Sequence, residues 1–232
     1  MERFSRTKTL LGDNNFEKLT KANVIVFGAG GVGGYVVEAL ARSGIGQITV
    51  VDKDVVSVSN INRQIIALSS TIGKKKTEVI KERVKDINPN CKVTVIDTFY
   101  LPENADQIDL SAYSFVVDAI DTVSAKIEII KRCSQKDIPI ISCLGTANHL
   151  DPFAFKIVDL YQTSTCPLAR VLRREARKLN IEKGKVKVLY STEEALKTFE
   201  QGGDKLSPCS IAFCPSVAGL LIASEVIKSL IR

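Results

Sequence analysis

Short apolar runs alternate with longer amphipathic segments through the first two thirds of the chain. Five runs are rich in β-branched residues and have the pattern of strands buried in a parallel sheet: residues 23–27, 48–51, 93–96, 115–117 and 138–142. Three segments carry apolar residues at helical spacing: residues 32–43, 74–88 and 123–136. Because alternating strands and helices are joined by right-handed crossovers, the pattern predicts a Rossmann-like, doubly wound α/β fold with a mostly parallel sheet.

The pattern changes after residue 151. Two segments alternate in the manner of strands with one exposed face, and a strongly basic segment between them predicts a helix: residues 153–160, 185–190 and 167–179, respectively. Residues 191–208 contain two adjacent glycines and few large apolar side chains, which predicts a mobile crossing loop. The chain closes in an apolar helix that we expect to be capped by Ser216 and to end at about Ile231. We therefore expect an extended C-terminal part after the alternating region.

The composition is that of a globular protein without a membrane span. The 232 residues are 45% hydrophobic and 25% charged, which allows a sizeable buried core. Residues 1–11 lack the apolar stretch of a secretory signal. The apolar run at residues 211–223 is interrupted by Pro215 and is too short to cross a bilayer, so a buried helix explains it better. We expect a cytoplasmic protein.

Cysteine and histidine usage argues against a structural metal site. None of the six cysteines has CxxC spacing, which a four-cysteine zinc site needs twice. His149 is the single histidine, so a metal site of several histidines is impossible. We expect His149 to be a loop residue near a strand end. The net charge of +6 modestly favours a polyanionic partner.

A glycine-rich turn lies directly between the first strand and the first long helix. Its glycines are Gly28, Gly30, Gly31 and Gly33, and such a turn brings backbone amides close to phosphate oxygens at a helix N-terminus. Asp52 ends the next strand, where a carboxylate accepts hydrogen bonds from a ribose diol. Alone, these features are typical of nicotinamide-dependent dehydrogenases.

The segment after Asp52 favours a triphosphate instead. Two carboxylates, several amides and a guanidinium follow the strand end: Asp52, Asp54, Asn60, Asn62, Arg63 and Gln64. Arg63 can fork onto phosphate oxygens, and Asn60 and Asn62 can orient them. Residues 73–76 bring a lysine to a helix start, and residues 117–122 bring carboxylates suited to a magnesium ion that bridges phosphates. Parallel strands place all these ends along one crevice.

The motifs GxGGVG, DxDxVxxSNxNRQ, GxxK and DAID resemble those of the ubiquitin-activating-enzyme-like adenylyltransferases, which include the activators of the molybdopterin and thiamine sulfur carriers. The resemblance covers Arg3 to about Ser142. It implies that ATP is bound by residues of these motifs, with Asp121 as the magnesium ligand and Arg63, Lys76 and Asp121 as catalytic residues: Gly28, Gly30, Gly31, Gly33, Asp52, Asp54, Asn60, Asn62, Arg63, Gln64, Lys76 and Asp121.

Family members of the sulfur-carrier type also carry an Arg-x-x-Arg near the N-terminus that reaches ATP across a dimer interface. Arg3-Phe4-Ser5-Arg6 fits this motif, so the resemblance implies a homodimer in which Arg6 acts in trans, although an ordinary solvated arginine explains Arg6 as well. By the same resemblance we expect a single ATP-binding α/β domain over residues 1–232. Residues 1–150 would be its nucleotide-binding part, and residues 151–232 a substrate-facing extension with the C-terminal helix.

Two departures point to one branch of the family. The chain lacks the two CxxC pairs of the sulfur-carrier activators, and Thr122 follows Asp121 where they usually have asparagine. The whole chain instead resembles the tRNA threonylcarbamoyladenosine dehydratases, in the segments TKTLLG, GIG, DINP, DAID, Lys126, DP and SVAG. This branch implies that AMP is transferred to the threonine carboxylate, after which the carbamoyl group attacks and closes a five-membered ring without any enzyme nucleophile.

Further features leave alternatives open. Four arginines of the basic segment share one helix face that could follow an RNA backbone or simply be solvated: Arg170, Arg173, Arg174 and Arg177. A thiol that receives an adenylated tail could be Cys166, Cys209 or Cys214, although free cysteines are mostly small buried residues. Activation of a ubiquitin-like sulfur carrier, a nucleotide-sensing scaffold and a dehydrogenase are the alternative functions, and docking of a sulfur-transfer protein stays open.

Overall fold

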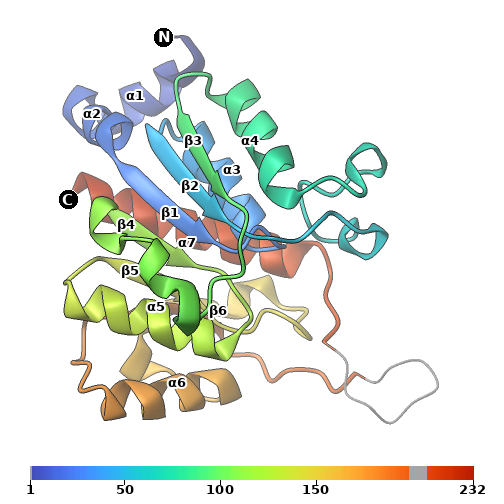
Figure 1. Cartoon of the computed structure of the whole chain (residues 1–232), viewed down its shortest axis with the longest axis vertical. Coiled ribbons are helices and arrows are strands. Elements are labelled where there is room, and N and C mark those ends of the chain that lie inside the picture. Colours follow the sequence, from blue (N-terminus) through green and yellow to red (C-terminus); the bar gives the residue numbers. More distant parts are fainter. Residues whose placement is uncertain (1, 199–207) are drawn as a thin grey trace.

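The structure is a computed structural model that describes residues 2–198 and 208–232 (Figure 1). Its seven strands form one sheet in the order β3-β2-β1-β4-β5-β7-β6. The pairs are parallel except β6–β7, which is antiparallel. The strands are β1 Asn23–Phe27, β2 Gln47–Val51, β3 Lys92–Ile96, β4 Phe115–Asp118, β5 Ile140–Cys143, β6 Phe155–Asp159 and β7 Lys187–Ser191. The predicted doubly wound, mostly parallel α/β fold is confirmed.

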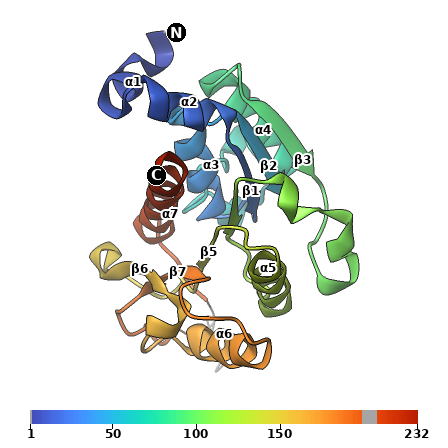
Figure 2. The ribbon, with the colours of Figure 1, turned by 90° about the vertical axis from the view of Figure 1, so that its left-hand side faces the viewer.

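Helices cover both faces of the sheet (Figure 2). One face packs against α3 and α7, with α2 and α4 beside them, and the other face packs against α5 and α6. The helices are α1 Ser5–Leu11, α2 Asp13–Lys21, α3 Gly33–Arg42, α4 Lys76–Ile87, α5 Val123–Gln135, α6 Pro167–Lys178 and α7 Phe213–Ile231. The first strand shows why two layers form: Val24 and Val26 enter one core, whereas Ile25 and Phe27 enter the other.

The direction in which successive strands are added to the sheet reverses between β1 and β4. The chain adds β2 and β3 on one side of β1 and then returns to place β4 on the other side. The carboxyl ends of β1 and β4, at Phe27 and Asp118, are therefore neighbours in register. A crevice forms at such a switch point because the connections leave the sheet in opposite directions.

The last helix starts earlier than the sequence predicted. It begins at Phe213, and Ser216 lies inside it with its Oγ donating a hydrogen bond to the carbonyl of Phe213 at 2.9 Å. The predicted cap at Ser216 is therefore wrong. Pro215 stands in the first turn, where a missing N–H breaks no helical hydrogen bond. Of the predicted crossing loop at residues 191–208, residues 199–207 lie outside the described residues.

Helix α7 is long and apolar enough to cross a membrane by length and composition. In this fold its inner face packs in the core against α3. At Gly219, a Cβ would lie 2.6 Å from the carbonyl oxygen of Val32, so glycine is needed for the two helices to approach this closely. The prediction that this run is too short to cross a bilayer is therefore wrong, because the helix continues to Ile231, whereas the predicted burial of the helix is found along its inner face.

Candidate functional site

A cleft of about 590 Å³ opens at the carboxyl ends of the parallel strands. Its walls come from the glycine turn after β1, from the segment after β2, and from the loops after β3, β4 and β5. Most of the predicted ATP-binding residues line it: Gly28, Gly30, Gly31, Asp52, Asp54, Asn60, Arg63, Gln64, Lys76 and Asp121. The fold thus brings residues that follow separate strand ends into one cavity.

The glycine turn is shaped by close backbone contacts. Gly28 has φ 91°, and a Cβ there would lie 2.6 Å from the carbonyl oxygen of Ala119. A Cβ on Gly33 would lie 1.8 Å from the carbonyl oxygen of Gly28, which no side chain tolerates. Gly33 is therefore required for packing α3 against the turn, and it does not line the cleft.

Asp52 ties the glycine turn to the end of β2. Its carboxylate accepts hydrogen bonds from the backbone N–H groups of Ala29 and Asp54, both at 2.7 Å. A carboxylate has about four acceptor positions, so others are left for a ligand hydroxyl. Asp52 is thus both a structural anchor of the turn and a candidate partner for a ribose.

Lys76 is a buried cation at the edge of the cleft. It is the first residue of α4, its side chain is 7% exposed, and its Nζ lies 2.8 Å from Oδ2 of Asp54. The backbone N–H of Lys76 also donates to the carbonyl of Asp54 at 2.9 Å. Since the half-exposed Asp54 holds the ammonium in place, the lysine is ordered before any anion arrives.

Arg63 lines the cleft and is held by its own loop. Its Nη1 donates to the carbonyl of Ser59 at 2.8 Å and to Oδ1 of Asn62 at 2.9 Å. Asn62 itself does not line the cleft, and its Nδ2 donates to the carbonyl of Ser210 at 3.0 Å. Asn62 therefore orients Arg63 and fastens the loop to the segment before α7.

Asn60 and Gln64 differ in their hydrogen bonding. Oδ1 of the buried Asn60 accepts a hydrogen bond from the backbone N–H of Ser57 at 3.1 Å. Gln64 is 6% exposed, and its Oε1 is buried without a hydrogen-bond partner in the described structure. An unpaired buried amide oxygen is costly, so this part of the cleft wall is held at an energetic cost.

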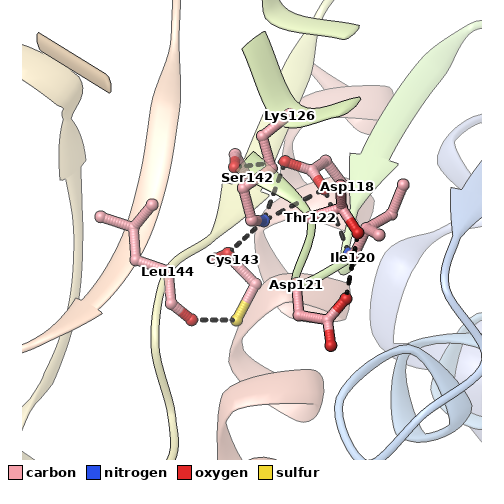
Figure 3. Close-up of polar contacts among 8 residues, drawn as sticks. All are labelled: Asp118, Ile120, Asp121, Thr122, Lys126, Ser142, Cys143 and Leu144. Carbon is pink, nitrogen blue, oxygen red and sulfur yellow. Dashed lines mark hydrogen bonds and ion pairs between the residues drawn. The ribbon is translucent and has the colours of Figure 1, made fainter. Parts of the chain in front are cut away.

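Asp121 is an exposed carboxylate in the turn after β4. Its Oδ1 accepts a weak hydrogen bond from Oγ1 of Thr122 at 3.4 Å (Figure 3). No group of three or more histidine, cysteine, aspartate or glutamate side chains that could hold a metal ion exists within the described ranges. Magnesium commonly takes one or two carboxylates plus phosphate oxygens, and Asp121 fits that donor set.

Several other residues line the cleft although no sequence motif marked them. Thr98, Phe99 and Tyr100 follow β3, and the loop 144–147 follows β5. Nζ of Lys53 lies 4.2 Å from the centre of the Phe99 ring, a cation–π contact. Each segment follows the carboxyl end of a parallel strand, so the rule that located Asp121 could have found them.

Lys126 also lines the cleft, although the family resemblance assigned it no task. Its Nζ lies 3.0 Å from Oδ2 and 3.1 Å from Oδ1 of Asp118, and it donates to the carbonyl of Cys143 at 2.6 Å (Figure 3). Both members of the ion pair are almost fully buried. This cluster lies at the base of the turn that carries Asp121.

The predicted catalytic arginine at the N-terminus is not in the cleft. Arg6 is exposed on α1 and is absent from the cleft walls. The other arginine of that motif, Arg3, donates through Nη1 to the carbonyls of Asp86 and Ile87 at 2.5 and 2.7 Å. Arg3 thus satisfies carbonyls at the C-terminal end of α4, and within one chain Arg6 is separate from the site.

The four predicted RNA-binding arginines lie on α6 but not on one uniform face. Arg170, Arg174 and Arg177 are exposed, and the Arg177 guanidinium lies 5.7 Å from the centre of the Tyr161 ring. Arg173 is half-buried and donates to the carbonyl of Thr163 at 2.9 Å and to its hydroxyl. Leu168 at the start of α6 lines the cleft, so this helix begins at the cleft wall.

Burial makes most of the thiols unreactive. It raises the pKa of Cys91 to about 11 and the pKa values of Cys133 and Cys143 to about 12, and it also raises the pKa of Cys214. Cys209 is exposed, but it is not part of the cleft wall although its neighbours Pro208 and Ser210 are. Its backbone N–H and carbonyl both bond to Asn148.

His149 lies in the loop after β5, as expected, and its side chain is buried. Its Nδ1 lies 3.4 Å from Oε2 of Glu193. Backbone hydrogen bonds from Asp151 and Leu150 and the nearby His149 lower the pKa of Glu193, against the opposing effect of burial. His149 is outside the cleft and serves the packing of this loop.

The sequence description of the ThiF family matches residues 4–232. The chain belongs to this family. It is 42% identical over 244 residues to the tRNA threonylcarbamoyladenosine dehydratase of Bacillus subtilis (strain 168), covering 100% of this chain and 96% of that protein. It is 41% identical over 198 residues to the enzyme of the same name from Escherichia coli (strain K12), covering 83% and 74% of the two chains.

The fold of this ThiF-family chain matches a solved enzyme over nearly its whole length. The crystal structure of the E. coli tRNA N6-threonylcarbamoyladenosine dehydratase in complex with ATP has a TM-score of 0.91 and 35% identity, covering 99% of this chain and 93% of that chain. By contrast, the molybdopterin-synthase adenylyltransferase of Salmonella typhimurium is 35% identical over only 54% of this chain and 50% of that protein.

Proposed function

We propose that this chain is an ATP-dependent tRNA threonylcarbamoyladenosine dehydratase. The observation that carries the proposal is the near-full-length similarity to enzymes of that name together with a cleft that gathers Arg63, Lys76 and Asp121. ATP is the cofactor, as in the solved E. coli complex. The activity is adenylate formation followed by loss of water from the substrate.

The glycine turn and the cations around it suit a bound triphosphate. The amides of the turn precede the N-terminus of α3, where the helix dipole favours negative charge. Arg63 and Lys76 are both restrained by hydrogen bonds, so little ordering cost opposes their contact with phosphate oxygens. Magnesium bound at Asp121 would neutralise phosphate charge and stabilise the pyrophosphate leaving group.

The reaction needs no enzyme nucleophile. The threonine carboxylate attacks the α-phosphorus and expels pyrophosphate, which gives an acyl adenylate. The carbamoyl group of the same residue then attacks the acyl carbon, and AMP leaves as the five-membered ring closes. Because the attack is intramolecular, its effective concentration is high. The task of Arg63 and Lys76 is to stabilise the charge that develops on the phosphate oxygens.

The RNA and the second subunit belong to the same proposal. Arg170, Arg174 and Arg177 are exposed on α6, and the helix starts at the cleft wall with Leu168. A tRNA backbone that follows α6 would bring its modified base to the cleft. Since Arg6 lies outside the cleft within one chain, its assigned role requires a homodimer. We place the enzyme in the cytoplasm, and docking of a sulfur-transfer protein is compatible with this assignment.

Nucleoside mass spectrometry tests the proposal. The purified protein is incubated with ATP, magnesium and tRNA that carries uncyclised threonylcarbamoyladenosine, and the nucleosides are then analysed. We expect a nucleoside lighter by one water, with AMP and pyrophosphate formed in equal amounts. An unchanged nucleoside mass, with ATP–pyrophosphate exchange that depends on a ubiquitin-like carrier, would instead assign the chain to the sulfur-carrier adenylyltransferases.

A further inference from the structure

Lys126 is a fully bonded buried lysine for which the proposed reaction has no use. Its side chain is 1% exposed, and its ammonium has three acceptor contacts: both carboxylate oxygens of Asp118 and the carbonyl of Cys143 (Figure 3). Asp118 also accepts from Oγ of Ser142 at 2.5 Å and from the backbone N–H of Ile120 at 3.2 Å. A buried ion pair is tolerated only when it is bonded as completely as this one.

The ammonium joins two strands beyond the point where their pairing ends. The last paired residues of β4 and β5 are Asp118 and Ser142. The next residue of β5, Cys143, has no partner in β4, while β5 continues to pair with β7 along its other edge. Lys126 spans this step from α5, reaching from the Asp118 carboxylate to the Cys143 carbonyl. The Lys126 side chain therefore links β4 and β5 just beyond their last paired residues, where no backbone pairing joins the two strands.

Both chain segments that leave this junction form walls of the cleft. The turn after Asp118 carries Asp121, and residues 144–147 follow Cys143. The backbone N–H of Lys126 donates to the carbonyl of Thr122, the N-cap of α5, at 3.1 Å, so the start of the helix that carries Lys126 directly continues the Asp121 turn. A change in the Lys126 contacts would move the two walls relative to each other.

We propose that Lys126 is a positioning residue for adenylate formation, which sets the spacing between the Asp121 turn and the wall formed by residues 144–147. The proposal rests on the proposed function for the identity of the reaction. Lys126 acts through the two walls and not on the substrate, because the protein itself occupies its donors. Its positive charge is neutralised by Asp118 and adds none to the cleft.

The decisive variant removes both charges together. Lys126→Met alone leaves a buried carboxylate without a cation, which destabilises the fold. In Lys126→Met/Asp118→Asn the amide oxygen still accepts from the backbone N–H of Ile120, the amide N–H₂ donates to Oγ of Ser142, and the link to Cys143 is removed. We expect the affinity for ATP without magnesium to stay within about threefold of wild type, while kcat per ATP-binding site falls about 100-fold, the loss typical of a displacement of about 1 Å.

Two further variants separate positioning from general damage. Lys126→Arg keeps the charge and its donors and should recover most of kcat. Glu128→Gln/Arg132→Met removes another ion pair of α5, at 2.6 Å and outside the cleft, and should leave kcat per site unchanged. A double variant at Lys126 and Asp118 with kcat within about threefold of wild type would overturn the proposal.

Amide hydrogen exchange tests the same idea without any reaction. In the double variant at Lys126 and Asp118, peptides that cover residues 119–122 and 144–147 should exchange about tenfold faster, while peptides of β1 and β2 keep their protection. Unchanged exchange in both turns would also overturn the proposal. If the wild-type protein itself forms no cyclised nucleoside, the proposed function fails, yet hydrogen exchange and ATP binding still decide the role of Lys126.

Discussion

The cleft and helix α6 both present positive charge, but they hold it in opposite ways. Lys76 is 7% exposed and bonded to Asp54, and Arg63 is restrained by Ser59 and Asn62. On α6, Arg174 is 67% exposed, and its partner Glu175 is on the same helix. The cleft cations are thus ordered before a ligand binds, whereas the exposed arginines of α6, Arg170, Arg174 and Arg177, are solvated and screened by salt.

This difference indicates that the cleft cations and the exposed arginines of α6 have different functional roles. A fixed cation in a partly buried site stabilises charge that develops in a transition state, because no reorganisation is needed at that moment. A solvated cation on a surface helix binds a phosphate backbone without regard to sequence, and its contribution falls with salt. We therefore expect variants in the cleft to change kcat and variants on α6 to change the affinity for tRNA.

The largest effect is expected for Arg63→Ala. Removal of a restrained guanidinium near the reacting phosphates should lower kcat/KM for dehydration by about 100- to 1,000-fold. Steady-state kinetics on the modified tRNA would measure it. Arg42→Ala is the matched control, because this arginine lies on α3, outside the cleft, and pairs with Glu38. If kcat/KM decreases by less than about tenfold, Arg63 does not stabilise the transition state and resembles the solvated arginines of α6.

A sharper comparison uses two neighbouring lysines. Lys76→Met should lower kcat by about 100-fold, since it removes a buried point charge from the cleft. Lys75→Met should change kcat by less than about twofold, because Lys75 is exposed and bonded to Asp97 outside the cleft. Equal effects of the two substitutions in the same assay would show that local charge, and not the fixed position of Lys76, matters.

The surface role of α6 is tested by the salt dependence of tRNA binding. Replacing Arg170, Arg174 and Arg177 by alanine should reduce the slope of log K against log salt by about two to three, since each phosphate that is neutralised accounts for about 0.7 to 0.9 of the slope. ATP affinity should not change. Arg173→Ala is the control: since Arg173 bonds to Thr163, it should lower the melting temperature and leave the slope intact. An unchanged slope in the triple variant would show that these three arginines are solvated and do not contact the tRNA backbone.

The smallest effect is expected for Cys209→Ser. The cyclisation requires no thiol, and Cys209 contacts Asn148 through its backbone, which the substitution keeps. We expect kcat/KM within about twofold of wild type, measured on the two proteins side by side. A decrease of more than about tenfold would restore the hypothesis that an enzyme thiol receives the adenylate.

The predictable part of the site consists of residues in the turns that follow the strands. Gly28, Asp52 and Asp121 were located because parallel strands place their carboxyl ends along one edge. Thr98 and Phe99 also follow the end of a parallel strand, but no chemical motif marks the segment after β3, so the motifs did not point to them. Ser216 was taken for a helix cap because serine favours that position, yet the apolar face of α7 extends the helix back to Phe213.

Contacts between residues that are far apart in the sequence were harder to predict. Asn62 reaches Ser210 across 148 positions, and Lys126 reaches Cys143 across 17. Arg173 was predicted to share a face with Arg170, but helical spacing does not show that its guanidinium bonds to Thr163. Such contacts depend on which surfaces the fold brings together, and helical or strand periodicity does not encode that.

For this protein, the amino-acid sequence by itself determined the α/β class, the glycine turn and the cations that follow β2. These features follow from local rules: β-branched runs pair in buried sheets, and only glycine allows the approach of Gly33 to Gly28. Tertiary structure alone decided which of the charged groups are restrained and which are solvated. The physical reason is that burial and bonding partners depend on the folded chain. Lys76 is buried and Lys75 is exposed, although they are adjacent residues of the same type. The ion pair of Asp118 and Lys126 is likewise buried, which residue type and spacing in the sequence do not show.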